Sequence, residues 1–270
     1  MKKFSRQILI IAALGLIIFL MIFSQNQYPI SREGGEREER KNNVPEIIQN
    51  ESPDQSPVLE KEATPAEKPL PENFLIKNVA FISQAPAKIW DDLHKEACEE
   101  ATLLIVKNYL DGKRGDEIDV NSGDEEIKKM VKWQTKIWGG HFDLSLEKVK
   151  QMAETIYGIK SEIKEIKSLD EIKKIISEGK LVIAPTAGRE LRNPYFQNPG
   201  PVYHMVVIFG YDKNNFIVHD VGTRRGANYK YPQKTLFDAI YDLAKEIMAK
   251  EELLANPALM FSGKKSILVF

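Results

Sequence analysis

Apolar residues recur at helical spacing in the first half of the folded part of this 270-residue chain. Over residues 146–157 they fall on one face of a helix, with Ser145 in the N-cap position and Gly158 directly after the last turn. An almost continuous apolar run predicts a second, buried helix over residues 97–110. Asp111 and Gly112 follow this run, and a glycine there suits the end of a helix.

Short apolar runs bounded by turn residues dominate the second half of the chain, a pattern typical of strands. The predicted strands cover residues 79–83, 159–166, 181–185, 203–210, 216–219 and 266–270. The other predicted helices are 124–133, a helix that follows the capping box at Ser168 and stops at Gly179, and 235–248. This segregation of helices and strands along the chain favours an α+β fold with an antiparallel sheet.

Two of these strands flank the most turn-like hexapeptide of the region and predict a β-hairpin. A turn at the centre of the hexapeptide pairs His204 directly with Asp220, with their Cβ atoms roughly 5 Å apart. Both side chains then project from the same face, because the side-chain period of a strand is two. We therefore expect a hydrogen bond between His204 and Asp220, and a structural role for His219 on the opposite face.

The N-terminus carries three basic residues followed by an uninterrupted apolar run from Ile8 to Phe23. A positive flank before such a run directs the N-terminus to the cytoplasm and the rest of the chain to the outside. The run is shorter than the ~20 residues of an ordinary span, so a cleaved signal peptide and a secreted protein are the alternative. The residues after Phe23 lack the small side chains that signal peptidase needs. Residues 1–23 are therefore predicted to be an uncleaved, single-pass membrane anchor.

The stretch after the apolar run is rich in proline and charge. Between Ser24 and Glu72 lie seven of the fourteen prolines and seventeen charged residues, eleven of them acidic. Such a segment cannot bury enough apolar surface to offset the entropy of ordering, so residues 24–73 are predicted to be a disordered tether. Residues 74–270 then form one domain, which is long enough to build a core without disulfides.

The net charge and the cysteine content of the chain bear on which partners and which chemistry to expect. The formal net charge of −1 gives no indication of a nucleic-acid partner. Cys98 is the single cysteine, so no internal disulfide can form. An unpaired thiol in an exported domain is unusual and indicates a reactive group. The alternative is that Cys98 is a small core residue, as many free cysteines are.

Cys98, His204 and Asp220 together are the parts of a thiol nucleophile, its base and the group that orients the base. Cys98 lies at the start of a predicted helix, where unpaired N–H groups and the helix dipole favour a thiolate. Glu99 and Glu100 stabilise the same helix end, yet they oppose thiolate formation if their carboxylates point to the sulfur. The sequence leaves open which of these effects prevails.

An oxyanion hole also requires hydrogen-bond donors, usually a backbone N–H and a side-chain amide. The backbone N–H of Cys98 is one candidate, and Gln84, just beyond the predicted strand 79–83, is the other. Around these residues the chain resembles the bacteriocin-processing (double-glycine) peptidase-like family of papain-fold cysteine peptidases. The segments that carry the resemblance are 81–86, the Cys98 helix, 203–212 and 216–220.

The resemblance implies a papain-like fold, in which a helical lobe carrying the nucleophile packs on an antiparallel β-sheet carrying histidine and aspartate. It also implies the roles of four residues: Cys98 as nucleophile, His204 as base, Asp220 as its orienting group and Gln84 as the oxyanion glutamine. The family typically has glycine where this chain has Glu99, and its Gln-to-Cys loop is usually shorter. Both departures concern the oxyanion hole and not the fold.

The sequence thus predicts a membrane-anchored, extracytoplasmic cysteine peptidase that hydrolyses peptide or isopeptide bonds of a peptide or protein substrate. Two alternatives are acyl transfer to an amine by the same residues, and a catalytically inactive papain-fold module that binds peptides or the cell envelope. No cofactor or metal is expected. His94 and Cys98 are four residues apart, as two zinc ligands can be, but no third cysteine or histidine lies nearby.

Overall fold

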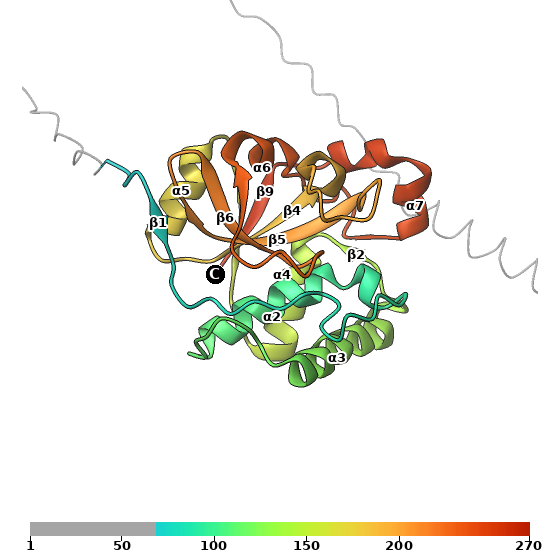
Figure 1. The fold of residues 1–270 in the computed structure, drawn as a ribbon. Helices are drawn as coiled ribbons and strands as arrows, with labels where there is room; N and C mark the ends of the chain where they lie inside the picture. The colour runs from blue at the N-terminus through green and yellow to red at the C-terminus, as the bar shows by residue number, and fades with distance from the viewer. Residues whose placement is uncertain (1–68) are drawn as a thin grey trace, which may run out of the picture. The chain divides into compact units, whose positions relative to one another are not determined.

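An antiparallel sheet of seven strands forms the centre of the computed structural model, which describes residues 69–270 (Figure 1). Its strands are β1 (Phe74–Leu75), β3 (Glu162–Glu165), β4 (Val182–Ala187), β5 (Tyr203–Tyr211), β6 (Asn215–Asp220), β7 (Tyr229–Pro232) and β9 (Ser266–Val269). Their order is β3-β9-β4-β5-β6-β7, and β1 pairs with β5 beyond this path. A separate two-stranded ribbon joins β2 (Asp143–Leu144) to β8 (Ile247–Met248).

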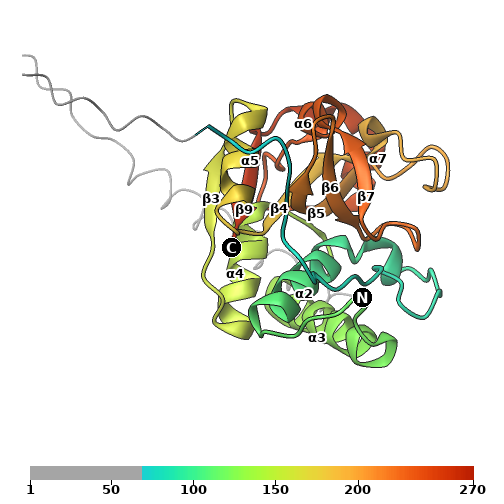
Figure 2. The same ribbon diagram turned by 60° about the vertical axis from the view of Figure 1, so that its left-hand side comes forward.

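Helices cover the sheet from two sides. The α-helices are α2 (Cys98–Leu110), α3 (Val120–Trp138), α4 (Leu146–Tyr157), α5 (Leu169–Ser177), α6 (Gln233–Ala239) and α7 (Lys250–Ala255). Short 3-10 turns are η1 (His94–Glu96), η2 (Gly188–Leu191) and η3 (Pro257–Phe261). Figure 1 shows α2, α3 and α4 below the sheet and α5 and α6 above it, and Figure 2 shows the same two lobes from another side. The predicted α+β architecture, with the cysteine helix packed on an antiparallel sheet, is confirmed.

Local sequence signals account for limits of three helices, α3, α4 and α5. α4 has the predicted bounds, and Gly158 ends it in the left-handed conformation that glycine adopts without strain. Ser168 caps α5 by accepting the N–H of Glu171, as the capping box predicts. α3 is longer than predicted because Asp119 caps it through the N–H of Ser122, one turn before the predicted start.

The strand β5 is the core of the sheet and carries the candidate histidine. All nine of its residues are buried, and it pairs with β6 on one side and with β4 and β1 on the other. α2 packs against one face of β5 and α5 against the other. A strand enclosed on both faces reads as a continuous apolar run, which explains the sequence from Tyr203 to Tyr211.

The β5–β6 hairpin exists, but its predicted register is wrong. Asp220 lies directly opposite Val206 and not opposite His204. A bulge between Ile208 and Gly210 adds one residue to β5, and the turn is displaced accordingly. At Asp220 the observed pairing differs from the predicted one by two residues. A shift of two residues leaves each side chain on the same face of the sheet. His204 and Asp220 therefore still project from one face, as diagonal neighbours.

Two other predicted elements differ from the structure. The segment 79–83 is extended but joins the rest through a single bridge from Phe81 to Glu117, so it is not a strand of the sheet. The predicted helix 235–248 ends at Ala239. There the backbone pairs with neighbouring chain instead: Ile240 bridges Thr186, and Tyr241 donates its N–H to Pro185. The apolar residues that gave the segment its helical pattern lie beside β4 instead.

The predicted anchor at residues 1–23 lies outside the described residues, as does the predicted tether up to residue 68. Within residues 69–270, no helix combines the length and apolar character that a membrane crossing requires.

Candidate active site

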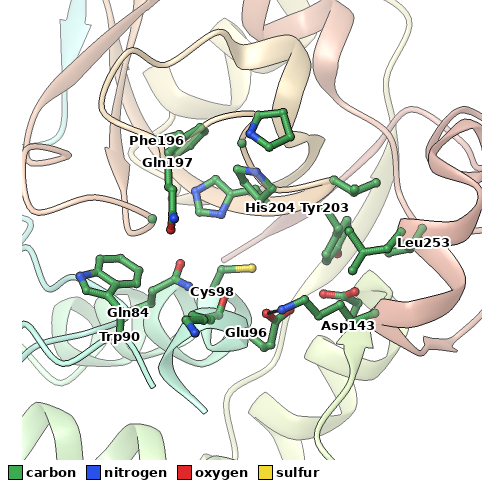
Figure 3. Close-up of a pocket in the computed structure, with 18 of the residues that line it drawn as sticks. Gln84, Trp90, Glu96, Cys98, Asp143, Phe196, Gln197, Tyr203, His204 and Leu253 are labelled. Carbon is green, nitrogen blue, oxygen red and sulfur yellow. Dashed lines mark hydrogen bonds and ion pairs between the residues drawn. The ribbon is translucent and has the colours of Figure 1, made fainter. Parts of the chain in front are cut away.

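Cys98 is the first residue of α2 and is almost completely buried at the floor of a pocket. Ala97 precedes it and has no side-chain oxygen, so no side chain caps the helix. The N–H groups of the first turn lack intrahelical acceptors and carry a partial positive charge. In Figure 3, Cys98 rises from α2 below the ring of His204.

The thiol of Cys98 donates a hydrogen bond to Oε2 of Glu99, with 3.0 Å between sulfur and oxygen. Burial raises the pKa of the thiol well above its ordinary value, and the charge of Glu99 raises it further. Burial, together with the charge of Glu100, also raises the pKa of Glu99 well above its ordinary range. The structure thus resolves what the sequence left open: Glu99 points to the sulfur, and the resting pair favours its protonated forms.

Glu100, the second carboxylate of this turn, contacts different residues. It accepts a hydrogen bond from Gln134 of α3 and lies 3.3 Å from Nε2 of His141. Burial lowers the pKa of His141, but the nearby Glu100 carboxylate outweighs burial, and the net pKa is raised. The imidazolium form of His141 therefore offsets the charge of Glu100 behind the cysteine.

His204 forms a hydrogen bond through Nε2 with Oδ1 of Asp220, at 2.8 Å. The contact expected from the sequence is therefore present, although the two residues are not directly paired. An ionised carboxylate only accepts hydrogen bonds, so in the neutral ring Nε2 carries the hydrogen and Nδ1 is the basic nitrogen. Among residues 69–270, Nδ1 has no hydrogen-bond partner, and His204 lines the pocket that holds Cys98.

Asp220 is held by three further donors. Its Oδ2 accepts hydrogen bonds from Asn193, at 2.8 Å, and from the hydroxyl of Tyr231, while Oδ1 accepts the N–H of Gly222 at 3.0 Å. Burial raises the pKa of Asp220, but the charge and hydrogen bond of His204 and the bonds from Tyr231 and Asn193 outweigh it. The net pKa lies below the ordinary value. The carboxylate is therefore ionised and fixed in orientation.

Gln84 lies in the pocket, but its amide hydrogens are occupied. Nε2 donates to the backbone carbonyls of His94, at 2.8 Å, and of Lys95, at 2.9 Å. Its Oε1 has no hydrogen-bond partner within the described chain. As it stands, Gln84 fixes η1 beside the pocket. A role as oxyanion donor requires Nε2 to leave one of these carbonyls.

The pocket that unites these residues has a volume of about 320 Å³. Figure 3 shows Gln84 and Trp90 at one end, Asp143 and Leu253 at the other, and Cys98 with His204 between them. No hydrogen bond joins Cys98 to His204 in the described part of the chain, because the thiol bonds to Glu99. The nucleophile and base candidates thus line one cavity without a hydrogen bond between them.

The sequence matches the Peptidase C39-like family over residues 76–248, which is more than half of the chain. The chain belongs to this family. The match confirms the family resemblance, and membership of the family suggests a cysteine peptidase.

A crystal structure described as that of a C39-like peptidase from Bacillus anthracis is also similar to this chain. Its sequence is 17% identical, the alignment covers 74% of this chain and 98% of that one, and the TM-score is 0.47. No match was found among the curated proteins.

The other two buried histidines of this C39-like chain have structural partners. His219 donates through Nε2 to the carbonyl of Val79, at 2.7 Å, and its ring packs against Phe209 and Phe81. Burial lowers its pKa to about 4. It projects away from Asp220, as expected. His94 lies in η1, before the helix that holds Cys98.

His94 bonds to two carboxylates and has no free ring nitrogen. Its Nδ1 lies 2.7 Å from Asp91 and its Nε2 lies 2.7 Å from Asp124. These contacts tie η1 to the start of α3. Over the described range, 69–270, no group of three or more histidine, cysteine or acidic residues is arranged to hold a metal ion.

Sequence reasoning missed several residues of this C39-like site. Asn193 and Tyr231 complete the shell of Asp220, but they come from a loop and from β7, which was not predicted. Gly222 lies so close to His204 that an added Cβ would be 2.8 Å from Cε1 of the ring. Asp143 lines the pocket from the two-residue strand β2. None of them has a local sequence signal, since only the fold brings them to the pocket.

Proposed function

We propose that this protein is a membrane-anchored cysteine peptidase that hydrolyses peptide or isopeptide bonds outside the cytoplasm. Cys98 is the nucleophile, His204 the general base and Asp220 the group that orients the base. The observation that carries this proposal is the His204–Asp220 hydrogen bond at the wall of the pocket whose floor is Cys98. A buried, ionised aspartate that fixes the tautomer of a pocket histidine is the arrangement that acyl transfer by a thiol requires.

In the first half of the reaction, Nδ1 of His204 accepts the thiol proton of Cys98. The sulfur then bonds to the carbonyl carbon of the substrate, and the electron pair of the C=O bond moves to the oxygen. When this pair returns, the C–N bond breaks, and the leaving amine takes the proton from His204. Asp220 stabilises the imidazolium form through the Nε2 hydrogen bond.

In the second half, His204 accepts a proton from water as the water oxygen bonds to the carbonyl carbon of the thioester. The C–S bond breaks, the acid product leaves, and the proton returns to the sulfur of Cys98. The backbone N–H of Cys98, at the start of α2, is available to the developing oxyanion. Gln84 becomes the second donor when Nε2 exchanges one of its backbone carbonyls for the substrate oxygen.

The resting thiol is consistent with this scheme. The charge of Glu99 opposes ionisation of Cys98 only while Glu99 is ionised, and burial favours its neutral form. A neutral Glu99 can turn its O–H toward the sulfur and donate to the thiolate, because 3.0 Å separates the two atoms. Proton transfer to His204 requires the sulfur to rotate from Glu99 toward the ring.

A second candidate function is supported by the same contacts. The thiol bonds to Glu99 rather than to His204, and both amide hydrogens of Gln84 are occupied. A papain-fold module that binds peptides without cleaving them would carry such a site.

A thiol-directed peptidyl probe distinguishes the two functions. Full-length protein incubated with a peptidyl vinyl sulfone is expected to become labelled at Cys98, as located by mass spectrometry of the digested product. Cys98→Ala should abolish labelling, and His204→Ala should slow it strongly while leaving the fold intact. Labelling of the wild-type protein no faster than that of the His204→Ala variant would favour the non-catalytic module.

A further inference from the structure

The two ends of the active-site pocket differ in their charge. At the Gln84 end the lining includes Lys95 and the half-exposed ring of Trp90. At the other end it includes Asp143, with Leu253 beside it (Figure 3). The lining also includes Glu96 and Lys250, which pair with each other, so Asp143 is the lining carboxyl group that has no partner within residues 69–270.

Asp143 is a buried carboxyl group without a partner. It is 7% exposed, and its side chain has no hydrogen bond or ion pair within residues 69–270. The backbone pairing of β2 with β8 fixes its position, since Asp143 lies opposite Met248. Figure 3 shows the carboxyl group directed into the pocket. Buried carboxyl groups in proteins are normally hydrogen-bonded or paired with a cation.

The cations near Asp143 are already engaged by other carboxylates. Lys250 of α7 pairs with Glu96, and His141 pairs with Glu100. Burial, followed by the charge of Glu96, raises the pKa of Asp143 to about 7, although His141 and Lys250 act in the opposite direction. An additional positive charge is therefore what this end of the pocket lacks.

The walls around Asp143 suit the stem of a long basic side chain. Tyr203 and Leu253 line the same end of the pocket with aromatic and aliphatic surface (Figure 3). Lysine and arginine bury their methylene groups against such surface while the charged head reaches a polar group. An apolar substrate side chain would leave Asp143 without a partner, and only a basic one supplies a positive charge.

We propose that Asp143 forms a subsite for a lysine or arginine side chain of the peptide substrate, close to the bond that Cys98 attacks. This inference rests on the proposed peptidase function, which it deepens by naming the class of substrate. In the complex, the ammonium or guanidinium group pairs with Asp143, and its stem lies between Tyr203 and Leu253.

Matched peptides that differ by one charge test the subsite. The probes are N-acetylated, C-amidated alanine octapeptides in which a single lysine, or its uncharged analogue norleucine, occupies successive positions. Acetylation excludes recognition of a free α-amino group. At pH 8, we expect full-length wild-type protein to cleave the lysine peptide with kcat/KM about tenfold higher than the norleucine peptide at one position, mainly through KM.

Two variants locate the preference. In Asp143→Asn the ratio of lysine to norleucine kcat/KM should fall to near one. Asp92→Asn removes the same charge from a fully exposed side chain outside the pocket lining, so the ratio should persist in that variant. Equal rates for the two peptides at every position, or a preference that survives Asp143→Asn, would overturn the subsite.

A binding measurement separates this inference from the proposed function. The same peptides, labelled with fluorescein, are titrated with full-length Cys98→Ala and followed by fluorescence polarisation. Tighter binding of a lysine peptide that is lost in Cys98→Ala/Asp143→Asn supports the subsite even if the wild-type protein cleaves no peptide. In that case only the peptidase proposal fails. Equal affinities for lysine and norleucine peptides would reject the subsite whatever the activity.

Discussion

The sulfur of Cys98 lies 3.0 Å from Oε2 of Glu99, and the other oxygen of Glu99 accepts the N–H of Leu144 at 2.9 Å. One carboxyl group thus links the nucleophile candidate to β2, the strand that also carries Asp143. The charge of Glu99 and its hydrogen bond both raise the pKa of the thiol. Glu99 therefore adds to the effect of burial, which is the main reason that Cys98 ionises with difficulty.

We expect Glu99→Gln to lower the pH at which Cys98 becomes reactive by about one unit, because glutamine cannot acquire the negative charge that Glu99 gains as pH rises. The glutamine oxygen can still accept the N–H of Leu144. The measurement is the rate of alkylation by iodoacetamide between pH 5 and 10, followed by mass spectrometry. Glu154→Gln, at an exposed position on α4, is the control and should behave as the wild type. Identical midpoints in the two variants would contradict this role.

Asp220→Asn should lower kcat/KM by about a hundredfold or more, because His204 loses the charge that fixes its tautomer and stabilises its cation. His219→Gln is the matched change on the opposite face. It is expected to reduce the free energy of unfolding by about 1–3 kcal/mol through the lost contacts with Phe81 and Phe209. Turnover per folded molecule should stay within a few-fold of the wild type. Inactivation by His219→Gln with an active Asp220→Asn would reverse the assignment.

Gly222→Ala tests the position of the His204 ring. The added Cβ would lie 2.8 Å from Cε1 of His204 and 3.0 Å from Cε1 of Phe196, so the ring must move. We expect turnover to fall by about tenfold or more, because the base leaves its productive geometry. Gly115→Ala has only one neighbour, at 4.0 Å, and should leave turnover unchanged. Equal activity of the two variants would show that the ring tolerates displacement.

Asp143 should make the stability of the fold depend on pH. Its pKa is about 7 in the folded chain, against an ordinary value of 3.8, so the folded state binds the proton more tightly. The free energy of unfolding therefore decreases as pH rises from about 4 through about 7. His219, whose pKa is lowered to about 4, acts in the opposite sense: its contribution is lost as pH falls below about 6.5.

Comparison with Asp143→Asn isolates the contribution of Asp143. This variant should unfold at the same denaturant concentration as the wild type at pH 4. At pH 8 it should be more stable by about 2–4 kcal/mol. Urea titrations followed by circular dichroism at both pH values give the difference. A variant less stable than the wild type at pH 8 would mean that a partner stabilises the carboxylate.

The proposed location gives a further prediction. Full-length protein should sediment with membranes, and protease added to intact protoplasts should cleave the folded domain. Deletion of residues 1–23 should release the domain from the membrane fraction. Recovery of the full-length protein in the soluble cytoplasmic fraction would refute both the anchor and its orientation.

Local signals in the sequence were sufficient for the helices near the nucleophile and for the partnership of His204 with Asp220. The helix at Cys98 and α4 follow from apolar runs and end signals that belong to the segments themselves. The predicted contact between His204 and Asp220 is present although the predicted register is wrong, because a shift of two residues keeps both side chains on one face. The bulge after Ile208 has no sequence mark, since it depends on the neighbours of β5.

Features that depend on distant segments could not be predicted. The direction of the Glu99 carboxyl group depends on the N–H of Leu144, forty-five residues away. Asn193 and Tyr231 donate hydrogen bonds to Asp220, but no pattern of spacing in the sequence links them to it. The helix predicted over 235–248 failed because pairing with β4 competes with helical hydrogen bonds, and only the assembled sheet presents that alternative.

The elements that form the pocket differ in local stability. His204 belongs to β5, whose residues are all buried between paired strands, so deuterium should enter its amides only when the whole domain opens. Lys250 and Leu253, which line the pocket, belong to the short helix α7, at the margin of the domain in Figure 1. Its amides should exchange through local fluctuations. Substitutions in α7 can therefore alter this side of the pocket, and with it the proposed substrate preference, without displacing His204.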